Sequence, residues 1–208
     1  TTFSHQSDKL ITTFSWLLSM CDKYPDKFSE YDVLWQYKWT IVALTDYSGI
    51  SLETIYDTLN DMIARFRKNG FYERNNFEYL NTIYMQVGEK EKAKEAFEEM
   101  MKIPYNRHDS MADCNACVRN QEVEYYIFAK EYQKALDHAK PLFSGWLSCA
   151  EVPAVTYANL YLPLIEMGKN DFALELFYKT DFNKKDIENY SSAIVLLCII
   201  GDLSKALY

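Results

Sequence analysis

One spacing recurs through most of this chain and constrains its fold more than any other feature. A small or polar residue precedes an alanine by five positions, and apolar residues at helical intervals lie on both sides. Successive pairs are 42, 38 and 33 residues apart, a recurrence typical of helical repeats. The four pairs are Gly88 and Ala93, Lys130 and Ala135, Gly168 and Ala173, and Gly201 and Ala206.

Each pair predicts two antiparallel helices that are joined at its first residue. The left-handed backbone that ends many helices favours a glycine such as Gly88, and an alanine such as Ala93 lets the second helix approach the first closely. One such hairpin cannot cover its own apolar face, so neighbouring hairpins must stack on it. Only 6 glycines and 5 prolines occur among the 208 residues, which also favours helices over a turn-rich fold.

The N-terminal third lacks this spacing but predicts helices over residues 8–21, 29–47 and 51–68. The middle helix is apolar nearly all round, which predicts that it is buried. We therefore predict an all-α protein, an α-solenoid of stacked antiparallel helical hairpins that forms one domain over residues 1–208. Its segments are predicted at 1–28, 29–70, 71–108, 109–148, 149–183 and 184–208, with the last one incomplete.

Residues around the joints resemble the tetratricopeptide repeat (TPR). A leucine lies eight positions before two joints (Leu80 and Leu160), and an aromatic residue lies nine positions after two of them (Phe97 and Phe177). The small residue that a TPR carries seven positions before the joint is replaced, which predicts looser or differently angled helix crossings. The replacements are Asn81, Val123, Tyr161 and Ile194.

Four short runs carry a further resemblance, at residues 35–39, 58–62, 113–117 and 148–151. Together they are similar to a family of bacterial TPR proteins without an assigned biochemical activity, with a DCxxC motif followed later by Cys-x-Glu. The resemblance implies a TPR-type fold and leaves the partner unidentified.

Charge and composition narrow the class of protein. The formal net charge is −8 and no segment is basic, which disfavours a nucleic-acid partner. The longest apolar run, residues 193–200, is too short to span a membrane. Five cysteines form an odd set, which favours a reducing cytoplasm over a disulfide framework. We expect a cytoplasmic protein without a membrane partner.

No nucleophile elbow, Walker loop or dinucleotide fingerprint occurs, so an enzyme is not predicted. We predict instead a scaffold that binds a basic or apolar peptide or helix on the concave face formed by the first helix of each hairpin. Alternatives are a peptide-sensing regulator and an immunity-type protein of a bacterial conflict system. The face is predicted to comprise Glu78, Thr82, Gln86, Asn120, Glu124, Phe128, Leu162, Glu166 and Glu188.

Cysteines give the sharpest local signal. Asp113 is a predicted N-cap, which would place Cys114 and Cys117 in the first turn of a helix, and Cys149 lies in the equivalent region of the next hairpin. Because the first helices of adjacent hairpins are expected to lie side by side, the three thiols are expected to come close together. The favoured interpretation is that they are small packing residues, so no cofactor is expected. The alternative is a metal- or redox-dependent module, in which His108 or Glu151 would complete a Zn²⁺ site.

Overall fold

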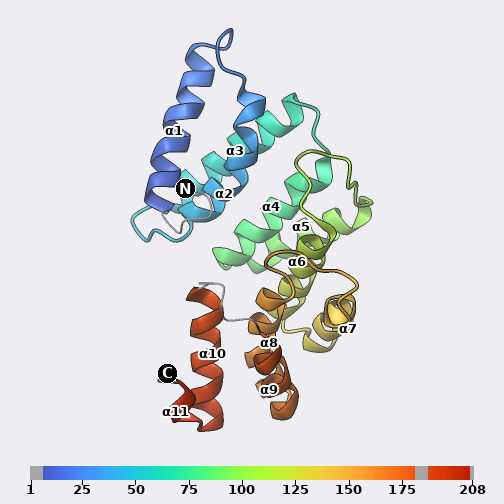
Figure 1. Ribbon diagram of the computed structural model, residues 1–208. Coiled ribbons are helices and arrows are strands. Elements are labelled where there is room, and N and C mark those ends of the chain that lie inside the picture. Colours follow the sequence, from blue (N-terminus) through green and yellow to red (C-terminus); the bar gives the residue numbers. More distant parts are fainter. Residues whose placement is uncertain (1–6, 181–186, 207–208) are drawn as a thin grey trace. The chain divides into compact units, whose positions relative to one another are not determined.

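Helices are the regular secondary structure of the part of the chain that the structure describes. The computed structural model describes residues 7–180 and 187–206, apart from the side chains of 187 and 188. Within these ranges there is no strand, which confirms the all-α prediction (Figure 1). The helices are α1 (Ser7–Lys23), the 3₁₀ helix η1 (Glu30–Asp32), α2 (Leu34–Leu44), α3 (Leu52–Lys68), α4 (Glu73–Gln86), α5 (Lys90–Lys102), α6 (Asn115–Phe128), α7 (Tyr132–Phe143), α8 (Ala154–Glu166), α9 (Asn170–Lys179), α10 (Ile187–Ile200) and α11 (Leu203–Ala206).

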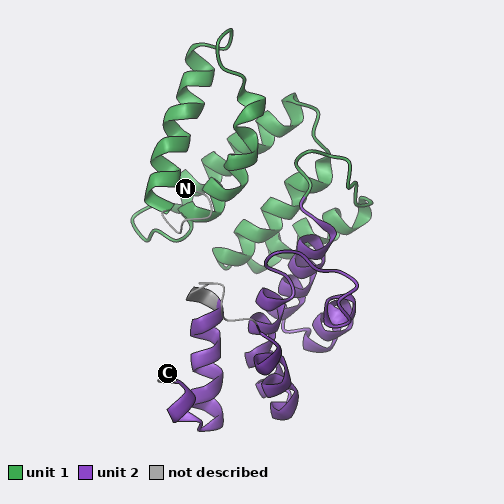
Figure 2. Cartoon of the chain, viewed as in Figure 1, with its two compact units in different colours: residues 1–112 green, residues 113–208 purple. Residues whose placement is uncertain are grey.

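The chain divides into two compact units, Thr1–Ala112 (unit 1) and Asp113–Tyr208 (unit 2) (Figure 2). The boundary falls inside the segment 109–148, which the sequence predicts as one repeat. Residues just before the boundary are tied to unit 1. The carboxylate of Asp109 accepts a hydrogen bond from the backbone N–H of Tyr72 at 2.7 Å, and the Lys38 ammonium donates to the Met111 carbonyl at 2.8 Å.

The joints of the predicted hairpins all end a helix in the same way. Gly88, Lys130, Gly168 and Gly201 have φ of 80°, 58°, 71° and 84°. At the first joint, the N–H of Glu89 donates to the carbonyl of Tyr84 at 2.8 Å and that of Gly88 donates to Met85 at 3.2 Å. This pair of bonds satisfies carbonyls that the helix end leaves free, and it recurs at the other three joints.

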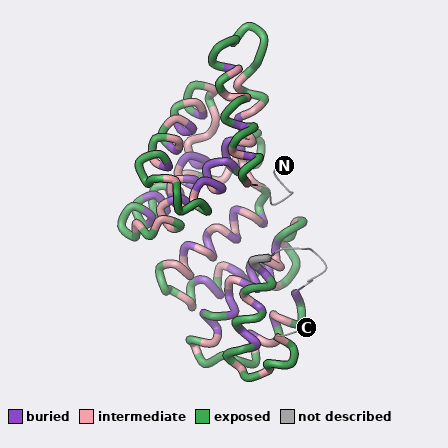
Figure 3. The backbone as a smooth tube through the Cα atoms, turned by 90° about the vertical axis from the view of Figure 1, so that its left-hand side faces the viewer, coloured by how far each residue is buried: buried purple, intermediate pink, exposed green. Residues whose placement is uncertain are grey.

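Helices on either side of a joint pack on each other: α4 on α5, α6 on α7, and α8 on α9. The alanine five positions after each of these joints, Ala93, Ala135 or Ala173, has no exposed surface. Along α5 the buried residues recur at the helical period, and Figure 3 shows the same alternation of buried and exposed positions along other helices. The buried residues of α5 are Ala93, Ala96, Phe97 and Met100.

In unit 2, α8 also contacts α6 and α10, so the first helices of successive hairpins are neighbours. The core between them is built from Val123 of α6, Tyr161 of α8 and Leu196 of α10, all without exposed surface. Val123 and Tyr161, which lie seven positions before their joints, are thus both members of the core. The Tyr161 hydroxyl is hydrogen-bonded to Thr180 at 2.5 Å, which satisfies its only polar group.

Unit 1 packs α2 against α1, α3 and α4. Burial of Leu34, Tyr37, Ile41 and Leu44 along its length confirms the prediction of a buried helix. The predicted start of the third helix is also confirmed, because Ser51 is the N-cap of α3 and accepts a hydrogen bond from the Thr54 N–H at 3.1 Å.

An ionic cluster centred on Arg65 joins α3 to the N-terminal part of unit 1. The Arg65 guanidinium donates to Asp22 at 2.8 and 2.9 Å, to Glu30 at 2.9 Å and to Asp61 at 2.8 Å. The Arg65 hydrogen bond holds the pKa of Asp22 below its usual range. Burial opposes ionisation of Glu30, but hydrogen bonds from Lys68 and Asn69 outweigh it, and the pKa of Glu30 is lowered as well.

We expect the variant Arg65→Met to be less stable than the parent at neutral pH and to lose less stability on acidification. A carboxyl whose pKa is lowered by folding stabilises the protein above its unfolded pKa, about 4, and this contribution is lost as pH falls through the folded value. Without Arg65, the pKa of Asp22 returns towards its unfolded value and its contribution disappears. The measurement is the free energy of unfolding in urea, from about pH 7 down to about pH 3.

The matched control is Lys94→Met, which removes the cation of an exposed pair with Glu98 at 3.9 Å. This variant should lose as much stability on acidification as the parent. If Arg65→Met were as acid-sensitive as the parent, the cluster would not contribute to stability in this way.

Candidate functional site

Unit 2 carries a polar network across α6 and α8, on the face that the sequence predicts for partner binding. Asn120 of α6 accepts a hydrogen bond from the Thr156 hydroxyl of α8 at 2.5 Å and donates to the Glu124 carboxylate at 2.7 Å. Asn159 of α8 donates to the same carboxylate oxygen of Glu124 at 3.0 Å. Asn120 and Thr156 are buried, whereas Glu124 is half-buried. The network therefore holds a partly exposed carboxylate in a fixed position.

Further along α8 the same face becomes apolar and then acidic again. Leu162 is 41% exposed, and Glu166 is exposed and accepts a hydrogen bond from the Tyr132 hydroxyl at 2.6 Å. Asn159, Leu162 and Glu166 are three and four positions apart, so they share one side of the helix. Phe128, at the end of α6, is half-buried. A fixed carboxylate, an exposed leucine and a second carboxylate thus follow one another on unit 2.

In unit 1 the predicted face has a different character. Glu78 is only 2% exposed and pairs with Arg74 at 2.9 Å, so it presents no carboxylate to a partner. Thr82 donates to the Glu78 carbonyl of its own helix at 3.0 Å, and exposed Gln86 accepts from the Thr45 hydroxyl at 3.0 Å. The repeat spacing predicts that Glu78 lies on the exposed face. It does not indicate that Arg74, one turn earlier, is buried and pairs with Glu78. The side chain of Glu188 lies outside the described residues.

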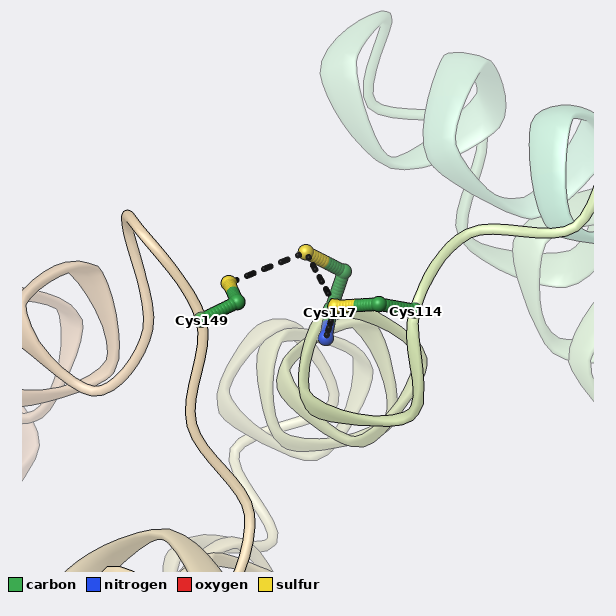
Figure 4. A group of neighbouring side chains, drawn as sticks. All are labelled: Cys114, Cys117 and Cys149. Atoms are coloured by element: carbon green, nitrogen blue, oxygen red, sulfur yellow. Dashed lines mark hydrogen bonds between the residues drawn. The ribbon is translucent and has the colours of Figure 1, made fainter.

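Cysteines 114, 117 and 149 converge at the start of α6. The Sγ atom of Cys117 lies 3.4 Å from that of Cys114 and 3.6 Å from that of Cys149, and all three lie within 4.8 Å of one another (Figure 4). Cys114 is exposed, and the other two are half-buried. The sequence prediction that these three residues come close together agrees with this arrangement.

Two of the three sulfurs accept hydrogen bonds from the backbone. Cys114, rather than the predicted Asp113, is the N-cap of α6, and its Sγ accepts from the Cys117 N–H at 3.4 Å. The N-cap is one residue later than predicted, because the sulfur of Cys114 accepts the capping hydrogen bond that the carboxylate of Asp113 was expected to accept. In the loop before α8, the Sγ of Cys149 accepts from the Val152 N–H, also at 3.4 Å.

The surroundings of Cys117 and of Cys149 shift the pKa values of these two thiols in opposite directions. Burial, together with the neighbouring sulfurs of Cys114 and Cys149, raises the pKa of Cys117. Burial also opposes ionisation of Cys149, but backbone N–H groups of Val152 and Glu151 outweigh it and lower the pKa of Cys149. Cys149 is therefore a thiol whose surroundings favour the thiolate, the form that binds metals and acts as a nucleophile.

Thr156 and Asn159, which complete the network on α6 and α8, were not among the predicted site residues. They are polar residues in a largely apolar stretch of α8, and this is the signal that could have found them. No family model and no curated protein matches the chain.

Proposed function

We propose that this chain is a TPR-like helical scaffold, an α-solenoid in architecture, which binds a protein segment on the face of α6 and α8. The observation that carries the proposal is the exposed Leu162 between two acidic positions, the carboxylate of Glu124 fixed by asparagines and the exposed Glu166. An apolar side chain flanked by carboxylates complements a partner that carries an apolar anchor between basic residues.

Neighbouring first helices support this reading. Because α8 contacts both α6 and α10, the face extends over several helices and could accommodate an extended peptide or a helix. Among the described residues, Glu166 is in no ion pair and has Tyr132 as its hydrogen-bond partner, so its negative charge is available to a basic segment. The proposed partner is accordingly a basic or amphipathic protein segment. We place the interaction in the cytoplasm, which the five free thiols support.

A random peptide library displayed on phage can test this directly. Peptides selected on the parent protein should be enriched in basic residues around an apolar one, and their association should slow as salt increases. We expect Glu166→Lys to slow association several-fold and to flatten the salt dependence, because rim charges mainly control encounter rate. Leu162→Ala should instead speed dissociation about five-fold or more, as expected for an anchor worth at least about 1 kcal/mol.

The matched control is Glu175→Lys, an equal charge reversal at an exposed position on α9, the second helix of the same hairpin. It should leave both rates close to those of the parent. The proposal fails if peptides bind the double variant Leu162→Ala/Glu166→Lys as tightly as the parent, while circular dichroism shows that this variant is folded.

A further inference from the structure

The three-cysteine cluster has the dimensions of a metal site. A tetrahedral Zn²⁺ with Zn–S bonds of about 2.3 Å separates its sulfur ligands by about 3.8 Å. Two of the three separations here are 3.4 and 3.6 Å, and the third is within 4.8 Å. Small side-chain rotations would bring all three to the tetrahedral value.

The backbone around the cluster suits thiolates. The N–H of Cys117 points at Cys114 Sγ, and the N–H of Val152 points at Cys149 Sγ, so two sulfurs are hydrogen-bonded independently of each other. Such bonds from the surrounding shell orient metal-bound ligands and tune their charge. Cys114 and Cys117 lie at the start of α6, so the positive end of the helix dipole is beside them. The negative charge that the three sulfurs would carry as metal ligands is thereby partly offset.

Packing alone does not account for this arrangement. Cys114 is exposed, so it is not a small residue that fills a buried contact. Beneath the cluster lies a small apolar core of Ala116, Leu142 and Val152, against which Cys117 and Cys149 pack. The sulfurs therefore have an apolar floor on one side and an opening at Cys114 on the other, as an ion-binding site requires.

The number of ligands defines the kind of site. Within the part of the chain that the structure describes, no fourth His, Cys, Asp or Glu joins the three sulfurs. Of the two predicted fourth ligands, Glu151 contributes its backbone N–H rather than its carboxylate, and His108 is not among the grouped ligands. Three protein ligands with one open position is the arrangement in which zinc keeps an exchangeable ligand.

We propose that Cys114, Cys117 and Cys149 bind one Zn²⁺ ion through three thiolates and leave the fourth coordination position to an exchangeable ligand. This assignment goes beyond the proposed scaffold function and is independent of it. The ion would connect the start of α6 to the loop before α8, two segments that are 32 residues apart. Binding would release the protons of those cysteines that are still thiols and would stabilise the folded form over the unfolded one.

Cobalt provides a spectroscopic test, because Co²⁺ occupies zinc sites and thiolate ligands give it a charge-transfer band. The full chain, reduced and freed of metal, should take up one equivalent of Co²⁺ with this band and the visible bands of tetrahedral cobalt. Zn²⁺ should then displace it. Cys114→Ser, Cys117→Ser and Cys149→Ser should each weaken binding by at least about 100-fold, since even outer-shell changes cost 10- to 100-fold. Cys198→Ser, at an exposed cysteine of α10, is the matched control and should bind like the parent.

A second measurement does not depend on variants that fold. In the parent, Zn²⁺ should protect Cys114, Cys117 and Cys149 from alkylation, as mapped by mass spectrometry, while Cys198 stays reactive. The absence of the charge-transfer band in protein whose five thiols are all reduced would overturn the proposal. So would an unchanged band in Cys149→Ser, or Zn²⁺ protection that does not include these three cysteines.

Discussion

Replacing Arg74 with alanine is expected to lower the free energy of unfolding by about 3 to 5 kcal/mol, the loss typical of a buried ion pair that loses one partner. Arg74 is 5% exposed and its partner Glu78 is 2% exposed, with Nε and Oε1 2.9 Å apart. The same guanidinium donates to the carbonyls of Met100 and Ile103, both at 2.8 Å. Truncation removes the cation from a buried carboxylate and leaves two carbonyls at the end of α5 without this donor.

The measurement is chemical unfolding followed by circular dichroism. Arg67→Ala is the matched control. Arg67 pairs with Glu73, the first residue of α4, which is also the helix of Arg74 and Glu78, but the side chain of Arg67 is 57% exposed. Exposed pairs contribute about 0 to 1 kcal/mol, so the control should be nearly as stable as the parent. The double variant Arg74→Met/Glu78→Met should recover part of the loss, since it leaves no unpaired buried charge. Equal effects of Arg74→Ala and Arg67→Ala would contradict this account.

Placing a carboxylate at a helix crossing should be comparably damaging. Ala93 and Ala135 have no exposed surface, so Ala93→Asp and Ala135→Asp each bury an unpaired charge and are expected to cost several kcal/mol. At the first position the Asn81 amide donates to the Ala93 carbonyl at 2.8 Å, which shows how closely the helices approach. A larger side chain would also force them apart.

Thermal and urea unfolding would measure this loss. Gln133→Asp provides the matched control, because it introduces the same side chain on the exposed side of α7, two residues from Ala135. We expect a change within about 0.5 kcal/mol for this surface substitution. An Ala135→Asp protein that unfolds like Gln133→Asp would show that the hairpin register inferred from the joints is wrong.

The helices could be predicted because their signals are local. Ser51 caps α3 through a residue three positions away, and the joint at Gly88 is closed by carbonyls three and four positions earlier. The buried alanines follow from the joints by a fixed count. Such relations are contained within one hairpin and do not depend on how distant parts of the chain pack.

The candidate sites were harder to predict because they depend on side chains from separate elements. The Glu124 carboxylate is positioned by Asn159, 35 residues later, and the register of α8 had to be known to within one residue. Glu78 was misplaced because Arg74 reaches the end of α5 and draws the pair into the core. The proximity of Cys117 to Cys149 was inferred from the repeat, whereas the backbone bonds to the sulfurs required the structure.

Lys130 occupies a joint where the three equivalent positions are glycine, and it adopts the same left-handed backbone with φ 58°. A side chain in this conformation costs roughly 1 to 2 kcal/mol, yet the two closing hydrogen bonds form as they do elsewhere. Closure of the hairpin is therefore imposed by the packing of its helices, and the residue at the joint adjusts stability without deciding the geometry. It follows that, as related sequences diverge, the glycine signature of these hairpins can be erased well before the hairpins themselves are lost.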